Sequence, residues 1–145
     1  MKNILVPLDL SAISDRVLDV ATEFAQRMNV KLWLVHVAAP EPDFVGFDVG
    51  PDSVREIRAD ELRKEHVDLQ RSAADLRNRS IECEALLVQG PTCDTILSMI
   101  TKLEADMVVM GSHGHSALYK TFVGSISEQV LAKSPVPVVI VPKLN

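Results

Sequence analysis

Asn3–Leu8, with the sequence NILVPL, is the first of five short apolar runs that together indicate the fold class. It is short, apolar and rich in β-branched residues, and Asp9 and Ser11 end it. A run of this length and composition is typical of a strand that is buried on both of its faces. Four further short apolar runs follow along the chain, and segments with the spacing of amphipathic helices separate them.

The expected elements alternate between strand and helix. The first helix has apolar residues every three or four positions, with Ser11 or Ser14 as its N-cap and Asn29 at its end. In chain order we expect a strand at 3–8, a helix at 13–28, a strand at 31–37, a loop at 39–51, a helix at 52–78, a strand at 81–89, a helix at 92–103, a strand at 106–110, a loop at 111–123, a helix of about ten residues through 130–131 and a strand at 136–141. The pattern predicts an α/β fold with a parallel, doubly wound five-stranded sheet in one domain over residues 1–145.

Composition excludes several classes of protein. The net charge of −5 argues against nucleic acid as the main partner, because phosphate backbones are bound through an excess of lysine and arginine. Cys83 and Cys93 have no zinc-like spacing and are expected to be buried, reduced thiols. The first apolar run is too short for a signal peptide or a membrane span, so a cytoplasmic location is expected.

A ligand of such a sheet binds at the carboxyl ends of its strands, where the strand order reverses. The loop after the fourth strand contains Gly111 and Gly114, and Gly124 precedes a helix that carries Ser125 and Ser127. Glycines let backbone N–H groups approach a phosphate, and the amino end of a helix favours an anion. The same residue types also mark ordinary surface turns, so composition alone leaves both interpretations open.

The spacing of these residues adds a resemblance to a known family. Residues 111–125 match G-x-x-G-x9-G-[S/T], the signature of the ATP-binding branch of the universal stress protein family. Similar segments occur in the same order at 4–11, 34–37, 90–91 and 134–141, so the resemblance extends along essentially the whole chain. It implies an adenine nucleotide alpha-hydrolase-like fold with strand order 3-2-1-4-5. It also implies a homodimer formed through the last strand.

The resemblance implies a nucleotide site built from strand ends and the glycine loop. Asp9 would contact the adenosine side, Val37 would line the adenine pocket, and Mg or Mn would accompany the phosphates of ATP. The implied site residues are Pro7, Leu8, Asp9, Val37, Met110, Gly111, Ser112, His113, Gly114, Gly124, Ser125, Ile126 and Ser127. Whether His113 and Lys120 contact phosphate or lie exposed to solvent is left open. His36, between two valines of the second strand, is expected to be a core histidine with its polar atoms satisfied.

The function expected from this site is regulation by ATP rather than catalysis. The chain has no GxxxxGK[ST] motif and no GxGxxG after its first strand, which argues against a P-loop ATPase and a dinucleotide enzyme. No general base, arginine finger or protein metal site is evident from spacing. A slow ATP hydrolase or phosphotransferase is the alternative, and a structural protein with an unused pocket is a third possibility. The sequence does not identify a downstream protein partner.

Overall fold

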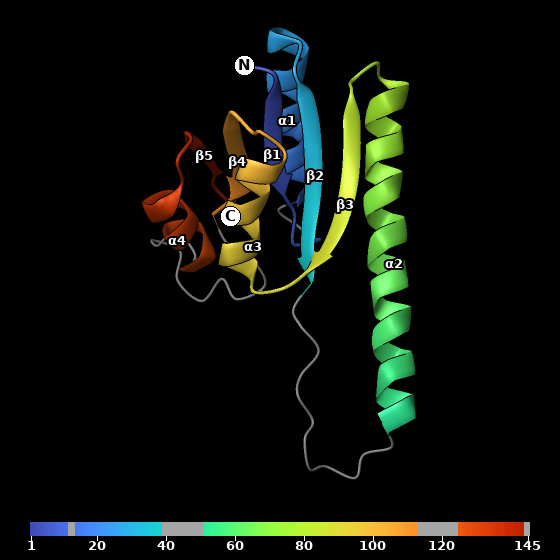
Figure 1. Cartoon of the computed structure of the whole chain (residues 1–145). Coiled ribbons are helices and arrows are strands. Elements are labelled where there is room, and N and C mark those ends of the chain that lie inside the picture. Colours follow the sequence, from blue (N-terminus) through green and yellow to red (C-terminus); the bar gives the residue numbers. More distant parts are fainter. Residues whose placement is uncertain (12–13, 39–50, 113–124, 144–145) are drawn as a thin grey trace.

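The computed structural model describes residues 1–11, 14–38, 51–112 and 125–143 of the chain (Figure 1). Strands and helices alternate along it as the sequence predicts. The elements are β1 (Asn3–Pro7), α1 (Ser14–Met28), β2 (Lys31–Ala38), α2 (Pro51–Asn78), β3 (Cys83–Gln89), α3 (Thr92–Lys102), β4 (Met107–Gly111), α4 (Ser125–Lys133) and β5 (Val138–Val141). The expected loops at 39–51 and 111–123 fall almost entirely outside the described residues.

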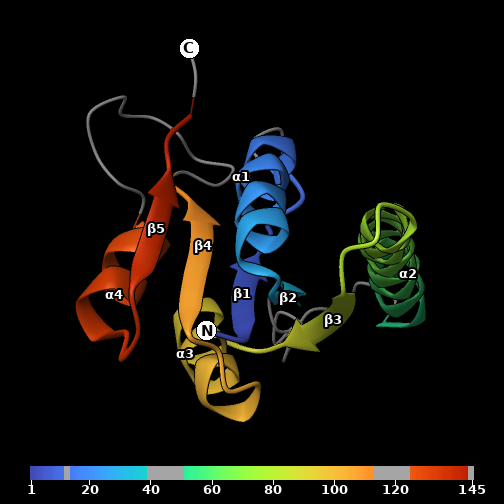
Figure 2. The ribbon, with the colours of Figure 1, turned by 90° about the horizontal axis from the view of Figure 1, so that it is seen from above.

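The five strands form one parallel sheet in the order β3-β2-β1-β4-β5, so the predicted doubly wound topology is confirmed. Helices α1 and α2 pack on one face, and α3 and α4 pack on the other (Figure 2). Strand β1 lies in the centre, and its residues Ile4, Leu5 and Val6 have no exposed surface. Each fully buried aliphatic side chain of this kind stabilises the fold by about 1.5 to 3 kcal/mol. Ile4 and Val6 contribute to the α1–α2 face, and Leu5 contributes to the α3–α4 face.

Strand β1 ends one residue earlier than the sequence predicts, and β3 and β5 each begin two residues later, both for a local reason. Ile81 precedes β3 because its N–H donates to the Leu76 carbonyl, and Ser80 with φ 62° closes the end of α2. Val136 precedes β5 because its N–H donates to Ser134 Oγ in a local turn. Backbone groups that close a turn are not available to a strand.

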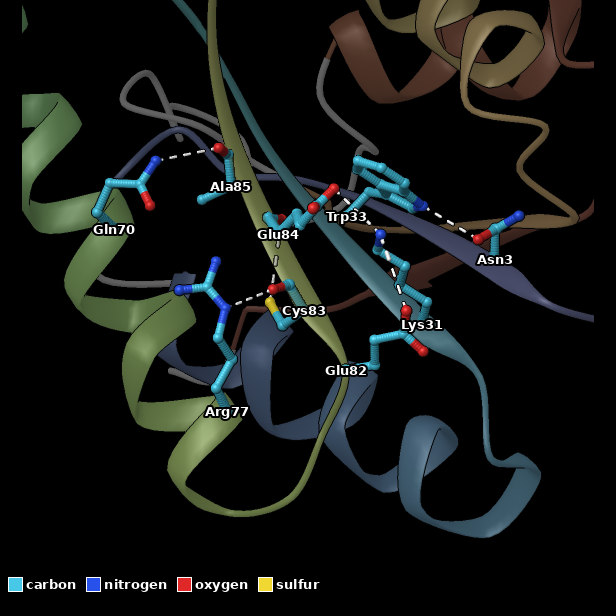
Figure 3. Close-up of polar contacts among 9 residues, drawn as sticks. All are labelled: Asn3, Lys31, Trp33, Gln70, Arg77, Glu82, Cys83, Glu84 and Ala85. Atoms are coloured by element: carbon cyan, nitrogen blue, oxygen red, sulfur yellow. Dashed lines mark hydrogen bonds and ion pairs between the residues drawn. The ribbon is translucent and has the colours of Figure 1, made fainter.

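The outer edge of β3 is covered by side chains of α2 (Figure 3). Arg77 Nε donates to the Cys83 carbonyl at 2.7 Å, and Gln70 Nε2 donates to the Ala85 carbonyl at 3.1 Å. These carbonyls point away from β2, because the carbonyl of Glu82, the residue before Cys83, accepts the Leu32 N–H and successive residues alternate in direction. Helix α2 therefore satisfies acceptors that would otherwise invite another strand to pair at this edge.

A polar cluster ties the amino ends of β1, β2 and β3 together (Figure 3). Lys31 Nζ lies 3.9 Å from the centre of the Trp33 ring and 3.1 Å from Glu84 Oε2. Trp33 Nε1 donates to Asn3 Oδ1 at 3.1 Å. The Lys31 charge is thus shared between an aromatic face and a carboxylate, and the indole N–H has a partner.

Asp106 joins the amino end of β4 to the start of β1. Its Oδ2 accepts the N–H groups of Lys2 at 2.7 Å and Asn3 at 3.0 Å, and its own N–H donates to the Asn3 carbonyl at 2.8 Å. The two backbone hydrogen bonds to the carboxylate lower the pKa of Asp106 below its ordinary value of 3.8. A carboxyl whose pKa is lowered by folding stabilises the fold at neutral pH and loses that effect as the pH falls through the lowered pKa.

We therefore expect Asp106→Asn to destabilise the protein at neutral pH and to matter little in acid. Urea unfolding of both proteins at about pH 7 and about pH 3 checks this expectation. The stabilising effect of the carboxylate is lost only at pH values below the ordinary carboxyl pKa. The difference between the two free energies of unfolding should shrink toward zero at the lower pH. A difference that stays constant across this range would contradict the role given to the carboxylate charge.

Candidate functional site

Strands β1 and β4 separate toward their carboxyl ends. β1 pairs with β2 from Asn3 to Pro7, whereas it pairs with β4 only at Ile4 and Leu5. Because the Leu8 N–H donates to the Val35 carbonyl of β2, the alternation of a parallel ladder turns the Pro7 nitrogen toward β4. Proline has no N–H to donate, so Pro7 cannot continue the ladder there. The separation lies at the point where the strand order reverses, which is the usual ligand position in such a sheet.

The segment after β1 is a turn organised by Asp9. Its Oδ1 accepts the Ser11 N–H at 2.9 Å, the Ser11 hydroxyl at 2.5 Å and the Ser14 hydroxyl at 3.3 Å. Leu10 has φ 61°, a conformation uncommon for a residue with a side chain. The carboxylate therefore holds the connection between β1 and α1, in addition to any contact with a ligand.

The ends of β2 and β3 form a second wall at the same edge of the sheet. Val37 and Val88 are half-buried neighbours in the ladder, and both pack on the α3–α4 face. Beyond β3, the Gly90 N–H donates to the Ala38 carbonyl at 3.2 Å. A Cβ atom at Gly90 would lie 2.6 Å from Thr95 Oγ1, so the turn into α3 needs the absence of a side chain at this position.

The end of β4 is bonded to the first turn of α4. Ser127 Oγ donates to the Gly111 carbonyl at 2.7 Å, and the Ser112 N–H donates to the Val141 carbonyl at 2.9 Å. Ser112 and Ser127 are buried, whereas Ser125 is exposed at the amino end of α4. The hydroxyl proton of Ser127 and the N–H of Ser112 thus hold the framework together.

The described residues of the predicted site all lie at this edge, on the ends of β1, β2 and β4 or in the first turn of α4. His113, Gly114 and Gly124 lie outside the described residues. Sequence reasoning missed two framework roles, the Ser127 hydroxyl bond and the use of the Leu8 carbonyl as an acceptor. Neither has a sequence signal, because both depend on backbone groups from another element. The prediction for His36 is confirmed: the residue is buried and its Nδ1 lies 2.7 Å from the Leu8 carbonyl oxygen.

The chemistry available among the described residues is limited. They include no group of three histidine, cysteine or acidic side chains able to hold a metal ion. Both cysteines are buried and unpaired, as expected, and burial raises the pKa of the Cys83 thiol to about 11. That thiol therefore stays protonated at neutral pH and is a poor nucleophile. In the part of the chain that the structure describes, no helix is both long and apolar enough to cross a membrane.

A five-stranded parallel sheet of this order, with helices on both of its faces, has the adenine nucleotide alpha-hydrolase-like fold. The chain belongs to the universal stress protein family, whose family model matches residues 1–142. A universal stress protein of Thermus aquaticus is 32% identical over 142 residues, which cover 97% of this chain and 98% of the relative. Members of this family are stress-response proteins.

Solved structures of this family share the fold. The structure of MJ0577, a universal stress protein of Methanocaldococcus jannaschii, superposes with a TM-score of 0.87 at 24% identity and covers 99% of this chain and 97% of its own. One universal stress protein was solved in complex with cAMP, with a TM-score of 0.71 at 22% identity over 97% of this chain and 96% of that one. Another, from Archaeoglobus fulgidus, was solved with dAMP, with a TM-score of 0.63 at 22% identity over 97% of each chain.

The hydrogen bond from the Ser127 hydroxyl to the Gly111 carbonyl can be tested for its role in holding α4 to β4. Ser127→Ala should lower the free energy of unfolding by about 1 to 2 kcal/mol, because a hydrogen bond inside the protein is lost. Ser125→Ala is the matched control, since Ser125 lies exposed two residues earlier on the same helix. Urea denaturation measures both variants. Equal losses in the two variants would show that the Ser127 hydroxyl does not hold α4 to β4.

Proposed function

We propose that this universal stress protein binds ATP at the edge where β1 and β4 separate, and that it acts as a nucleotide-dependent switch rather than as an enzyme. The observation that carries the proposal is the position of the G-x-x-G-x9-G-[S/T] segment. It runs from Gly111, at the end of β4, to Ser125, at the start of α4. The complexes of two family structures with cAMP and dAMP support an adenine nucleotide as the ligand.

The phosphates would lie against the first turn of α4 and the glycine loop. The amino end of a helix carries a partial positive charge and N–H groups without partners in the helix, both of which favour an anion. The exposed hydroxyl of Ser125 can donate a hydrogen bond there, whereas the Ser127 hydroxyl already donates to Gly111. Gly114 and Gly124 belong to the same proposed phosphate-binding loop. Whether His113 also contacts the phosphates is an open question.

The adenosine end would lie between the end of β1 and the end of β2. Asp9 offers a carboxylate, and Val37 offers a half-buried apolar surface that suits a purine ring. A magnesium or manganese ion would be held mainly by phosphate oxygens and water, since the described residues offer no cluster of metal ligands.

Switching is preferred over turnover because the described side chains at this edge serve as framework. The Asp9 carboxylate organises the turn before α1, and the Ser127 hydroxyl anchors α4. Phosphate release should therefore be far below the median enzyme rate of about 10 per second. A robust Mg-dependent turnover that is lost on substitution of His113 or Ser127 would instead establish the slow hydrolase or phosphotransferase.

Calorimetric titration with ATP and magnesium tests the binding site through Asp9. Asp9→Ala should weaken ATP binding by about 1.5 to 3 kcal/mol, because a hydrogen bond between the ligand and a charged group is lost. Ser11→Ala is the control, since it removes a partner of the same carboxylate within the turn and leaves Asp9 in place. Failure of the unmodified protein to bind any adenine nucleotide would overturn the proposed function. Unchanged affinity in Asp9→Ala would restrict Asp9 to the turn.

The proposed partner is a second copy of this chain, paired through β5. Strand β5 is the other edge of the sheet, and its residues Val138, Val139 and Ile140 are only partly buried. The Val108 N–H donates to the Pro137 carbonyl, and the Ser112 N–H donates to the Val141 carbonyl. By alternation, the backbone groups of Val138 and Ile140 point away from β4. This edge offers a short apolar strand for pairing, in contrast to the covered edge of β3.

The alternation of β5 allows the homodimer to be tested with proline. Ile140→Pro removes an N–H that points outward, so it should give a monomer that still unfolds cooperatively. Val139→Pro removes an N–H that points toward β4, so it should destabilise the fold itself. Sedimentation and thermal unfolding compare the variants with the unmodified protein. A monomeric unmodified protein, or a dimer retained in Ile140→Pro, would rule out pairing through β5.

A further inference from the structure

His36 connects three elements from within the core. It lies on β2, its exposed fraction is 8%, and its Nδ1 is 2.7 Å from the carbonyl oxygen of Leu8, the residue that follows β1. A carbonyl oxygen can only accept a hydrogen bond, so the geometry assigns the hydrogen to Nδ1. The ring therefore donates to the backbone of a predicted site residue.

The Leu8 backbone is held to β2 at both of its polar groups. Its N–H donates to the Val35 carbonyl at 2.8 Å, and its carbonyl accepts from the His36 ring. The paired register of β1 with β2 ends one residue earlier, at Pro7, and Leu10 two residues later has φ 61°. The imidazole thus fixes the last peptide group before the chain turns away from the sheet.

The second ring nitrogen faces α2. His36 Nε2 lies 3.3 Å from Glu65 Oε2, a buried oxygen that has no aligned hydrogen-bond donor among the described residues. Leu69, one helical turn after Glu65, has no exposed surface and packs in the same core as Leu34 of β2. The ring is therefore held by a hydrogen bond on its β1 side, and its other nitrogen lies next to the Glu65 carboxylate of α2.

We propose that His36 is a positioning residue for the nucleotide site, and this inference rests on the proposed function. The Leu8 carbonyl and the Asp9 N–H belong to one peptide plane. Fixing that plane sets the direction in which Asp9 leaves the sheet and therefore where its carboxylate meets the ligand. A small displacement of a positioned polar group weakens a hydrogen bond steeply, because the bond depends on distance and angle. His36 acts through Leu8 and Asp9 and does not touch the nucleotide itself.

A matched pair of variants separates the two sides of the ring. His36→Asn places its amide nitrogen near the position of Nδ1 and can still donate to the Leu8 carbonyl. His36→Gln places its amide nitrogen near the position of Nε2 and loses that bond. Both variants lose the ring, so their melting temperatures should fall by similar amounts. ATP affinity should stay within about threefold of the unmodified value in His36→Asn and fall about tenfold in His36→Gln, the effect of one hydrogen bond.

The backbone amide of Asp9 gives a second measurement that needs no ligand. In ¹⁵N NMR spectra of the ligand-free protein, this amide should shift and exchange faster with solvent in His36→Gln, and should stay near its original position in His36→Asn. Equal changes at Asp9 in both variants, or equal affinities, would overturn the positioning role. If the unmodified protein binds no adenine nucleotide, the proposed function fails and the assignment of His36 to a nucleotide site fails with it. The Asp9 amide then still shows whether the imidazole fixes the peptide.

Discussion

The hydrogen bonding of β1 on both of its sides determines how the neighbouring strands and the candidate site are arranged. Its even-numbered residues bond toward β2 and its odd-numbered residues toward β4, as the bonds of Lys2, Leu8 and Asn3 show. Its central side chains are fully buried on both faces, so the strand cannot slip by one residue without exchanging the two cores. With β1 fixed, a proline at position 7 necessarily turns its nitrogen toward β4. The separation at the site is therefore a consequence of the register.

The two ends of β4 are held by hydrogen bonds to different neighbours. At its amino end, Asp106 draws β4 against β1 through three hydrogen bonds. At its carboxyl end, β4 is held on its other side, by β5 through Ser112 and by α4 through Ser127. The strand is thus anchored to β1 where the core begins and to β5 and α4 where it leaves β1. This distribution holds the carboxyl end of β4 in place although its pairing with β1 has ended.

The sequence carries enough information for the fold, and less for the site. Buried strands such as β1 can be predicted because apolar runs and helical spacing are local patterns. The predicted end of α1 at Asn29 is confirmed by the φ of 52° of that residue. The prediction that β3 begins at Ile81 and β5 at Val136 is wrong, because the N–H groups of these two residues donate hydrogen bonds within turns. The glycine spacing predicts a ligand at this edge, where Gly111 and Ser125 lie. Which groups there serve as framework could not be predicted, because the partners of His36 and Ser127 are backbone carbonyls from other elements.

The placement of polar groups also bears on the proposal that the protein binds a nucleotide at this edge without catalysing a reaction. A catalytic group needs a proton or a lone pair that is free to move to the substrate. At this edge Asp9 accepts three hydrogen bonds from its own turn, Ser127 donates to Gly111, and His36 donates to Leu8. Each bond fixes a backbone segment that would face the ligand, and each engages a group that general acid–base chemistry would require. Rigid positioning and proton transfer compete for the same side chains, and the described residues favour positioning.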